Sequence, residues 1–205
     1  MKMKLASLVA AAALTVSSIA NATLITNGGF EDSTITNGWT YYSDIGGWEG
    51  DNIEVWASGF NGVTSYEGSK HGELNAHPYD GTAFSIYQSF ATSTGAAYDV
   101  SLAYRARSSN SESFRLELFT GDLTSRTHLL DVVLDSRLNV WNTYLNDFVG
   151  TGSETYLMLT SIVPSAGTVG NFIDAVSVSE VPEPATLALM GLGLAGLAGA
   201  RRRSK

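Results

Sequence analysis

Apolar and polar residues alternate along most of the chain between residues 23 and 181, where helical periodicity is almost absent. The clearest stretch covers residues 98–107. Its odd positions are polar or small, whereas its even positions form an apolar set, namely Tyr98, Val100, Leu102, Tyr104 and Ala106. A period of two is typical of a strand with one buried face. We therefore predict a strand over residues 98–107 with the apolar set facing the core.

The same alternation, punctuated by Gly, Asn, Ser and Asp, predicts further strands. They are expected near residues 84–90, 114–118, 128–134, 143–149, 155–163 and 171–179. Short strands at this spacing, in one domain of about 160 residues, are typical of two packed antiparallel sheets. The predicted fold class is all-β, an antiparallel β-sandwich, with a jelly roll favoured over other sandwiches.

The first 22 residues have the organisation of a secretory signal peptide. A basic start, Met1–Lys4, precedes an apolar run from Leu5 to Val16, and Ala20-Asn21-Ala22 has the small residues of a cleavage site. We predict an N-terminal signal helix, removed by signal peptidase after Ala22, in preference to an ordinary N-terminal helix. The mature protein is then exported.

A second change of composition follows the predicted domain, residues 23–180. Pro182 and Pro184 stop the last strand, residues 185–200 carry no charge, and residues 201–205 are strongly basic. The uncharged part spans ~24 Å as a helix, short of the ~30 Å hydrocarbon core. The basic cluster favours the cytoplasmic side. We predict a short C-terminal transmembrane helix that halts export temporarily, and a permanent single-pass anchor is the alternative.

Residues 181–205 resemble the PEP-CTERM sorting signal, whose namesake motif corresponds to Pro182, Glu183 and Pro184. The resemblance implies recognition by an exosortase, cleavage near the tripeptide, and only transient contact of the tail with the inner membrane. It also implies delivery to the cell surface or the extracellular matrix of a Gram-negative bacterium that makes exopolysaccharide and a biofilm.

Charge and cysteine content narrow the function classes. The chain has no cysteine, which excludes disulfides, thiolate zinc sites and cysteine nucleophiles. All twenty acidic residues lie within residues 23–184, and six of the twelve basic residues lie outside it, so this segment carries a net charge of −14. Such a surface repels polyanions, and we expect no binding of nucleic acid. Neutral sugars and divalent cations remain compatible with it.

Two acidic residues at opposite ends of the predicted domain are candidate metal ligands. Glu31 closes the segment 27–31, Asn-Gly-Gly-Phe-Glu, and Asp174 alternates in phase with Phe172 and Val176, which predicts a carboxylate on the apolar face. A buried carboxylate needs a cation, N–H donors or a proton. Both segments resemble those of carbohydrate-binding-module-like (galactose-binding-like) jelly rolls. The resemblance implies a structural Ca²⁺ held by Glu31 and Asp174, with a calcium-free hydrogen-bond network as the alternative.

A polar row between residues 65 and 77 is the candidate ligand site. Alternate side chains of this stretch point the same way on an extended strand, and aromatic residues lie nearby in the sequence. Aromatic faces stack on sugar rings, and carboxylates and amides bind their hydroxyls. The predicted glycan-binding residues are Trp56, Tyr66, Glu67, His71, Glu73 and Asn75. A solvent-facing strand without a ligand is the alternative, and zinc is disfavoured because no H-E-x-x-H or thiolate motif supports it.

Catalysis has little support in the sequence. There is no G-x-S-x-G motif, and twenty acidic residues make chance carboxylate pairs uninformative. We expect a protein that is not an enzyme: an exosortase-sorted surface or matrix protein whose sandwich binds exopolysaccharide or another glycan. A structural or adhesive surface protein without a sugar site is the alternative, and a secreted hydrolase is disfavoured.

Overall fold

The computed structural model describes residues 22–78, 84–182 and 193. The compact unit that ends at Val181 consists of strands β1–β11 and one short 3-10 helix, η1 (Phe60–Gly62). The prediction of an all-β domain is confirmed. The predicted signal helix and C-terminal transmembrane helix lie outside the described residues. Within the described residues, no helix has the length and apolarity needed to cross a membrane.

One sheet has six strands in the order β1-β3-β4-β11-β6-β9, and all its pairings are antiparallel. In that order the strands are β1 (Trp39–Tyr42), β3 (Ile53–Ala57), β4 (Lys70–Glu73), β11 (Phe172–Glu180), β6 (Ala97–Arg105) and β9 (Asn142–Val149). The last strand of the domain therefore lies in the middle of this sheet.

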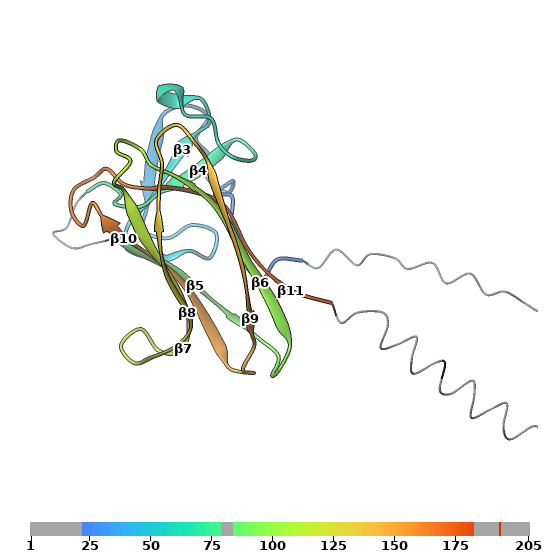
Figure 1. The fold of residues 1–205 in the computed structure, drawn as a ribbon. Coiled ribbons are helices and arrows are strands. Elements are labelled where there is room, and N and C mark those ends of the chain that lie inside the picture. Colours follow the sequence, from blue (N-terminus) through green and yellow to red (C-terminus); the bar gives the residue numbers. More distant parts are fainter. Residues whose placement is uncertain (1–21, 79–83, 183–192, 194–205) are drawn as a thin grey trace, which may run out of the picture. The chain divides into compact units, whose positions relative to one another are not determined.

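The other sheet has five antiparallel strands in the order β2-β5-β10-β7-β8. They are β2 (Glu49–Gly50), β5 (Ser85–Ala91), β10 (Glu154–Val163), β7 (Ser113–Gly121) and β8 (Arg126–Asp135). Successive strands from β8 to β11 alternate between the two sheets, as in a jelly roll (Figure 1).

The core lies between the two sheets, because each contributes one apolar face to a single cluster. From β6 this cluster takes Tyr98, Val100, Leu102 and Tyr104, and from β7 and β10 it takes Phe114, Leu116, Leu118, Leu157 and Leu159. The period-two prediction is therefore confirmed for these strands. The outer faces of the two sheets point in opposite directions, away from this shared core.

Strand β11 departs from simple alternation at one residue. Its register with β6 shifts between Asp174 and Ser177, and Ala175 has a positive φ of 52°. The extra residue of such a bulge reverses the side-chain phase, so that Ile173 and Val176 both enter the core. Asp174 pairs with Ala103 on the outer face of the six-stranded sheet instead. The predicted position of Asp174 on the core face is thus corrected.

Candidate functional site

The row predicted to bind sugar is mostly enclosed. Trp56, His71, Glu73 and Asn75 are buried, whereas Tyr66 and Glu67 are exposed. The reason is that loop side chains cover this part of the outer face of the six-stranded sheet. Phe60 packs on Trp56 with ring centroids 5.0 Å apart, and Trp141 meets His71 edge-on at 5.8 Å. The four buried side chains are inaccessible to a ligand in this structure.

Glu73 belongs to a buried ionic network that the sequence pattern did not reveal. Its carboxylate accepts hydrogen bonds from Arg107 Nη1, at 2.7 and 2.9 Å, and from the backbone N–H of Gly170 at 2.8 Å. Glu54 lies opposite it on β3 and accepts a 2.7 Å bond from Trp56 Nε1. Burial above all, and then the charge of Glu54, raises the pKa of Glu73 well above its ordinary value. The arrangement is that of a structural network.

His71 is held in the same covered region. Its Nδ1 lies 2.9 Å from Ser65 Oγ, and its ring meets Phe172 edge-on at 4.8 Å. Its Nε2 has no hydrogen-bond partner in the part of the chain that the structure describes. Burial, and then the charge of Arg105, lowers the pKa of His71 to about 4. The imidazole is therefore neutral at neutral pH, and it packs as an aromatic group.

Glu31 and Asp174, the two predicted metal ligands, reach the same loop. Asp174 Oδ2 accepts the backbone N–H groups of Tyr66 and Glu67 at 2.8 and 3.1 Å. Glu31 Oε1 accepts those of Ser69 and Lys70 at 2.6 and 2.9 Å. The first and last segments of the domain thus fix residues 66–70 from both ends. These contacts are those expected from the hydrogen-bond network that is the alternative to a Ca²⁺ site.

The surroundings of Asp174 also suit a hard cation. Asp174 is fully buried, and this burial raises the pKa of its carboxyl to about 7, with Glu67 adding repulsion. A side chain at Gly29 would lie 3.4 Å from Glu67 Oε1 and 3.7 Å from Asp174 Oδ1. The space beside Gly29 therefore lies between the carboxylates of Glu67 and Asp174. No described lysine or arginine forms an ion pair with either carboxylate. Oxygen ligands of this kind fit Ca²⁺. The carboxylates of both predicted ligands already accept hydrogen bonds, Asp174 on Oδ2 and, from the N–H of Ala175, on Oδ1, and Glu31 from Ser69 and Lys70.

A groove of about 460 Å³ lies on the outer face of the five-stranded sheet. Tyr87 of β5 and Tyr156 of β10 line it together, with ring centroids 6.2 Å apart. Both side chains alternate with residues of the core, and both remain partly exposed. Polar and loop residues complete the lining, namely Glu49, Ser89, Asp122, Leu123 and Thr124. The groove therefore combines aromatic rings with carboxylates and hydroxyls.

The ring of Tyr156 is supported from within the same sheet. It stacks on Phe119 with the ring centroids 5.2 Å apart and the planes only 6° from parallel. The guanidinium of Arg126 lies over Phe119, 4.8 Å from the ring centroid. On the rim, Tyr87 Oη donates to Glu49 Oε2 at 3.2 Å. These contacts hold the two aromatic rings in place before any ligand arrives.

Tyr87 and Tyr156 are not among the residues that the sequence pattern predicts to bind a ligand. The signal for them lies in the alternation itself, since each is an aromatic residue in the polar phase of its strand, beside Ile86 and Leu157 in the core phase. An aromatic residue in the polar phase of a strand is not needed for the core between the sheets. Only the pairing of β5 with β10 brings the two together.

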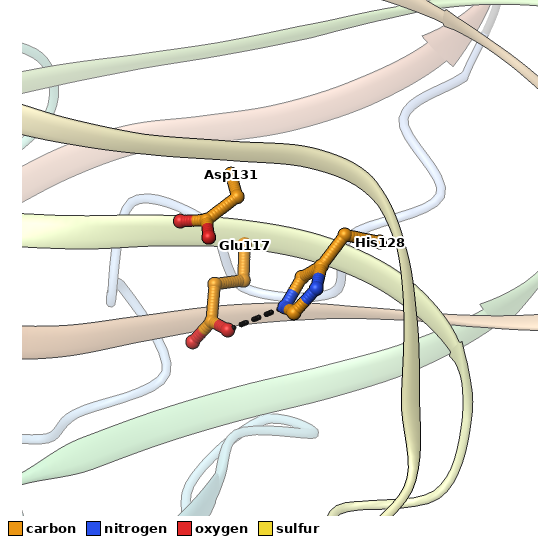
Figure 2. A group of neighbouring side chains, drawn as sticks. All are labelled: Glu117, His128 and Asp131. Carbon is orange, nitrogen blue, oxygen red and sulfur yellow. Dashed lines mark hydrogen bonds and ion pairs between the residues drawn. The ribbon is translucent and has the colours of Figure 1, made fainter.

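A second polar group lies beside this groove on β7 and β8, formed by Glu117, His128 and Asp131 (Figure 2). Their nearest ligand atoms lie within 4.8 Å of one another. Glu117 already binds His128 Nε2 at 2.8 Å and Arg126 Nη1 at 3.0 Å, and Asp131 pairs with Arg115 at 3.4 Å. Two guanidinium groups thus balance two carboxylates, and the group supports Arg126 over Phe119 without a metal.

Comparisons with known proteins identify the tail and the fold. Residues 180–203 match the PEP-CTERM protein-sorting motif, which implies export and exosortase-dependent sorting to the cell surface. No curated protein matches the chain significantly. Of the namesake tripeptide the structure describes Pro182, whereas Glu183 and Pro184 lie outside the described residues.

The solved structures that resemble the chain are mostly carbohydrate-binding modules. The CBM22-1 xylan-binding domain of Paenibacillus barcinonensis Xyn10C has a TM-score of 0.51 at 15% identity, covering 82% of this chain and all of that domain. TmCBM61, solved with β-1,4-galactotriose, has a TM-score of 0.50 at 14% identity, covering 78% and 99%. A CBM 22 xylan-binding domain has a TM-score of 0.50 at 16% identity, covering 81% and 99%. These similarities show a shared fold, the carbohydrate-binding-module jelly roll.

Proposed function

We propose that this exported protein, sorted by its PEP-CTERM tail, is a non-catalytic glycan-binding module whose sugar site is the Tyr87–Tyr156 groove. The observation that carries the proposal is the pair of supported tyrosine rings in a groove with carboxylates at its rim. Xylan and β-1,4-galactotriose, named for the solved domains of the same fold, define the first ligands to test.

The groove would bind sugar by two complementary kinds of contact. The apolar faces of pyranose rings pack on Tyr87 and Tyr156, which removes apolar surface from water at little entropic cost because the rings are already fixed. Hydroxyl groups of the sugar donate to the carboxylates of Glu49 and Asp122 or to Ser89. Both rim charges are negative, so the groove favours a neutral glycan over an acidic one.

Affinity electrophoresis in gels containing soluble β-1,4-xylan or β-1,4-galactan tests this site. We expect the wild-type domain to be retarded by at least one of them, and Tyr156→Ala to weaken binding about tenfold or more, equivalent to about 1.4 kcal/mol. Tyr41→Ala is the matched control, because Tyr41 is an exposed tyrosine on β1 in the other sheet. Equal retardation of wild type, Tyr87→Ala and Tyr156→Ala contradicts the assignment.

The destination of the protein follows from its tail. We propose that exosortase removes the segment after the Pro-Glu-Pro motif and that the mature domain joins the exopolysaccharide matrix of a Gram-negative cell. Mass spectrometry of protein released from intact cells measures the C-terminus directly. A surface-located product that still ends in residues 201–205 would favour a permanent membrane anchor.

A structural calcium ion is the second part of the proposal. Asp174 and Glu67 would hold it, together with main-chain carbonyl groups, and Glu31 would act beside it by fixing Ser69 and Lys70. When bound, the ion supplies positive charge that offsets the repulsion between Asp174 and Glu67. The loop carrying Tyr66 would then be held to β11 by the ion as well as by hydrogen bonds.

A further inference from the structure

A second groove lies on the opposite side of the sandwich, over β6 and β9. It has a volume of about 390 Å³, and its lining includes Tyr66, Ser101, Ala103, Thr143, Leu145 and Ala175. Short side chains form part of its lining, since Ala103 is fully buried and Ala175 is half-buried. Leu145, on the edge strand β9, is 69% exposed. The groove is separated from the Tyr87–Tyr156 groove by the whole core.

Tyr66 is held in this groove by contacts that do not use its outer surface. Its backbone N–H is bound by Asp174, and its ring meets the edge of Trp141 at 6.1 Å. Trp141 is itself tied to the loop by a 2.9 Å hydrogen bond from its Nε1 to the carbonyl oxygen of Thr64. The Tyr66 side chain nevertheless remains 48% exposed. A large aromatic ring is therefore fixed at the surface without being covered.

The polar groups of the groove are free to bind a partner. Within the described structure, the hydroxyls of Ser101, Thr143 and Tyr66 form no hydrogen bond with another residue. Among the described residues, no lysine, arginine or acidic side chain is part of the lining. A ring, a leucine and three uncommitted hydroxyls without formal charge match a neutral sugar, which has apolar ring faces and many hydroxyls.

We propose that this Tyr66 groove is a second glycan-binding site and that one domain binds two neutral polysaccharide chains at once. The proposal rests on the glycan-binding function proposed above. Because the two sheets share one core, their outer grooves face opposite ways and cannot both contact the same short glycan. A domain with two such sites links separate polysaccharide chains, and multivalent contacts of this kind raise the apparent affinity for a long polymer.

Isothermal titration with short xylo- and galacto-oligosaccharides counts the sites. We expect two sites in the wild-type domain, one in Tyr66→Ala, one in Tyr156→Ala, and none in the double variant. Tyr66→Phe keeps the ring and is expected to keep two. Leu145→Ser alters the groove wall on β9 without touching the loop, so it serves as a second test, expected to weaken the Tyr66 site several-fold.

Light scattering with the long-chain polysaccharides measures the cross-linking. Wild type is expected to build large complexes, whereas each single-site variant binds without doing so. One site in the wild-type domain, or two sites of unchanged affinity in both Tyr66→Ala and Leu145→Ser, overturns the second site. A variant Tyr156→Ala that keeps both sites overturns the proposed primary groove alone, and absence of all binding overturns both proposals. Thermal melting of each variant confirms that it is folded.

Discussion

Glu31 and Asp174, near opposite ends of the domain, hold one loop between them. Asp174 accepts the N–H groups of Tyr66 and Glu67, and Glu31 accepts those of Ser69 and Lys70. The loop between these residues carries Tyr66 on the surface and, through Ser65, touches the buried His71. The hydrogen bonds from Glu31 and Asp174 to this loop therefore fix one wall of the Tyr66 groove. They also fix part of the cover over His71.

Calcium is expected to stabilise this closure. At a free concentration 100 times its Kd, a ligand of the native state adds about 2.7 kcal/mol, which corresponds to a rise of about 5–10 °C in the melting temperature of a domain of this size. We expect that rise on replacing a chelator with Ca²⁺, and its loss in Asp174→Asn. Asp44→Asn, at an exposed aspartate, is the control that keeps the rise. Identical melting with calcium and chelator contradicts calcium binding.

Two adjacent glycines are expected to respond differently to alanine. A Cβ at Gly28 would collide with the backbone carbonyl of Val176, a group that cannot move aside, so Gly28→Ala should cost several kcal/mol of stability. At Gly29 the Cβ would instead occupy the space beside Glu67 and Asp174 at ordinary contact distances. Gly29→Ala should fold and lose the calcium-dependent melting shift. The reverse order of stability, measured by urea unfolding, would contradict the observed packing of this segment on β11.

The burial of His71 predicts a pH-dependent stability. Its folded-state pKa of about 4 lies below the ordinary value of 6.5, so the unfolded chain binds the proton more readily. The stability that the neutral, buried His71 provides is fully present above pH 6.5. As the pH drops towards 4, the free energy of unfolding falls by about 3 kcal/mol in total.

Comparison with His71→Gln isolates this contribution, because Glu73, whose pKa is raised, changes stability in the opposite direction with pH. Urea unfolding at pH 7 and pH 4.5 should show the wild type losing more stability than His71→Gln over this range. His77→Gln, at an exposed histidine, is expected to follow the wild type. Parallel pH profiles for wild type and His71→Gln would mean that His71 is accessible to protons in the folded state.

Removing Arg107 is expected to cost more stability than removing the charge of Glu73. Arg107→Met leaves the buried Glu73 beside Glu54 without its cation, and removing one partner of a buried pair typically costs about 3–5 kcal/mol. Glu73→Gln should cost less, because the amide oxygen still accepts the N–H of Gly170 and the repulsion from Glu54 disappears. The double variant should recover part of the loss. Equal costs for both single variants in urea unfolding would contradict this account.

The local alternation of apolar and polar residues was enough to predict the sandwich. Which side of a strand faces the core depends only on residues that are neighbours in the sequence. The strand predicted at residues 98–107 forms as β6, Ala97–Arg105, with the expected inward face. The position of Asp174 could not be predicted in this way, since one bulge residue, Ala175, reverses the phase of the strand. A bulge in a strand leaves no reliable mark in an alternation of apolar and polar residues.

The candidate site was harder to predict, because it depends on which loops cover which face. His71 and Glu73 do share a face, as their spacing predicts. That region is enclosed by Phe60, from the connection between β3 and β4, and by Trp141, from a segment distant in the sequence. Tyr66 remains on the surface for the same reason that His71 does not: it lies on the covering loop itself. Sequence spacing gives the phase of a side chain, and only tertiary contacts decide its exposure.

The junction between the sandwich and the sorting motif has no spacer. Val181 still donates its N–H to the carbonyl oxygen of Ala97, while the matched motif begins one residue earlier, at Glu180. Three extended residues reach only ~10 Å, so any peptide bond near Pro184 lies within that distance of the edge of a folded sheet. An enzyme that cleaves near Pro184 would therefore have to accommodate the end of the folded sandwich next to its active site. Exchanging this domain for another would change what lies there.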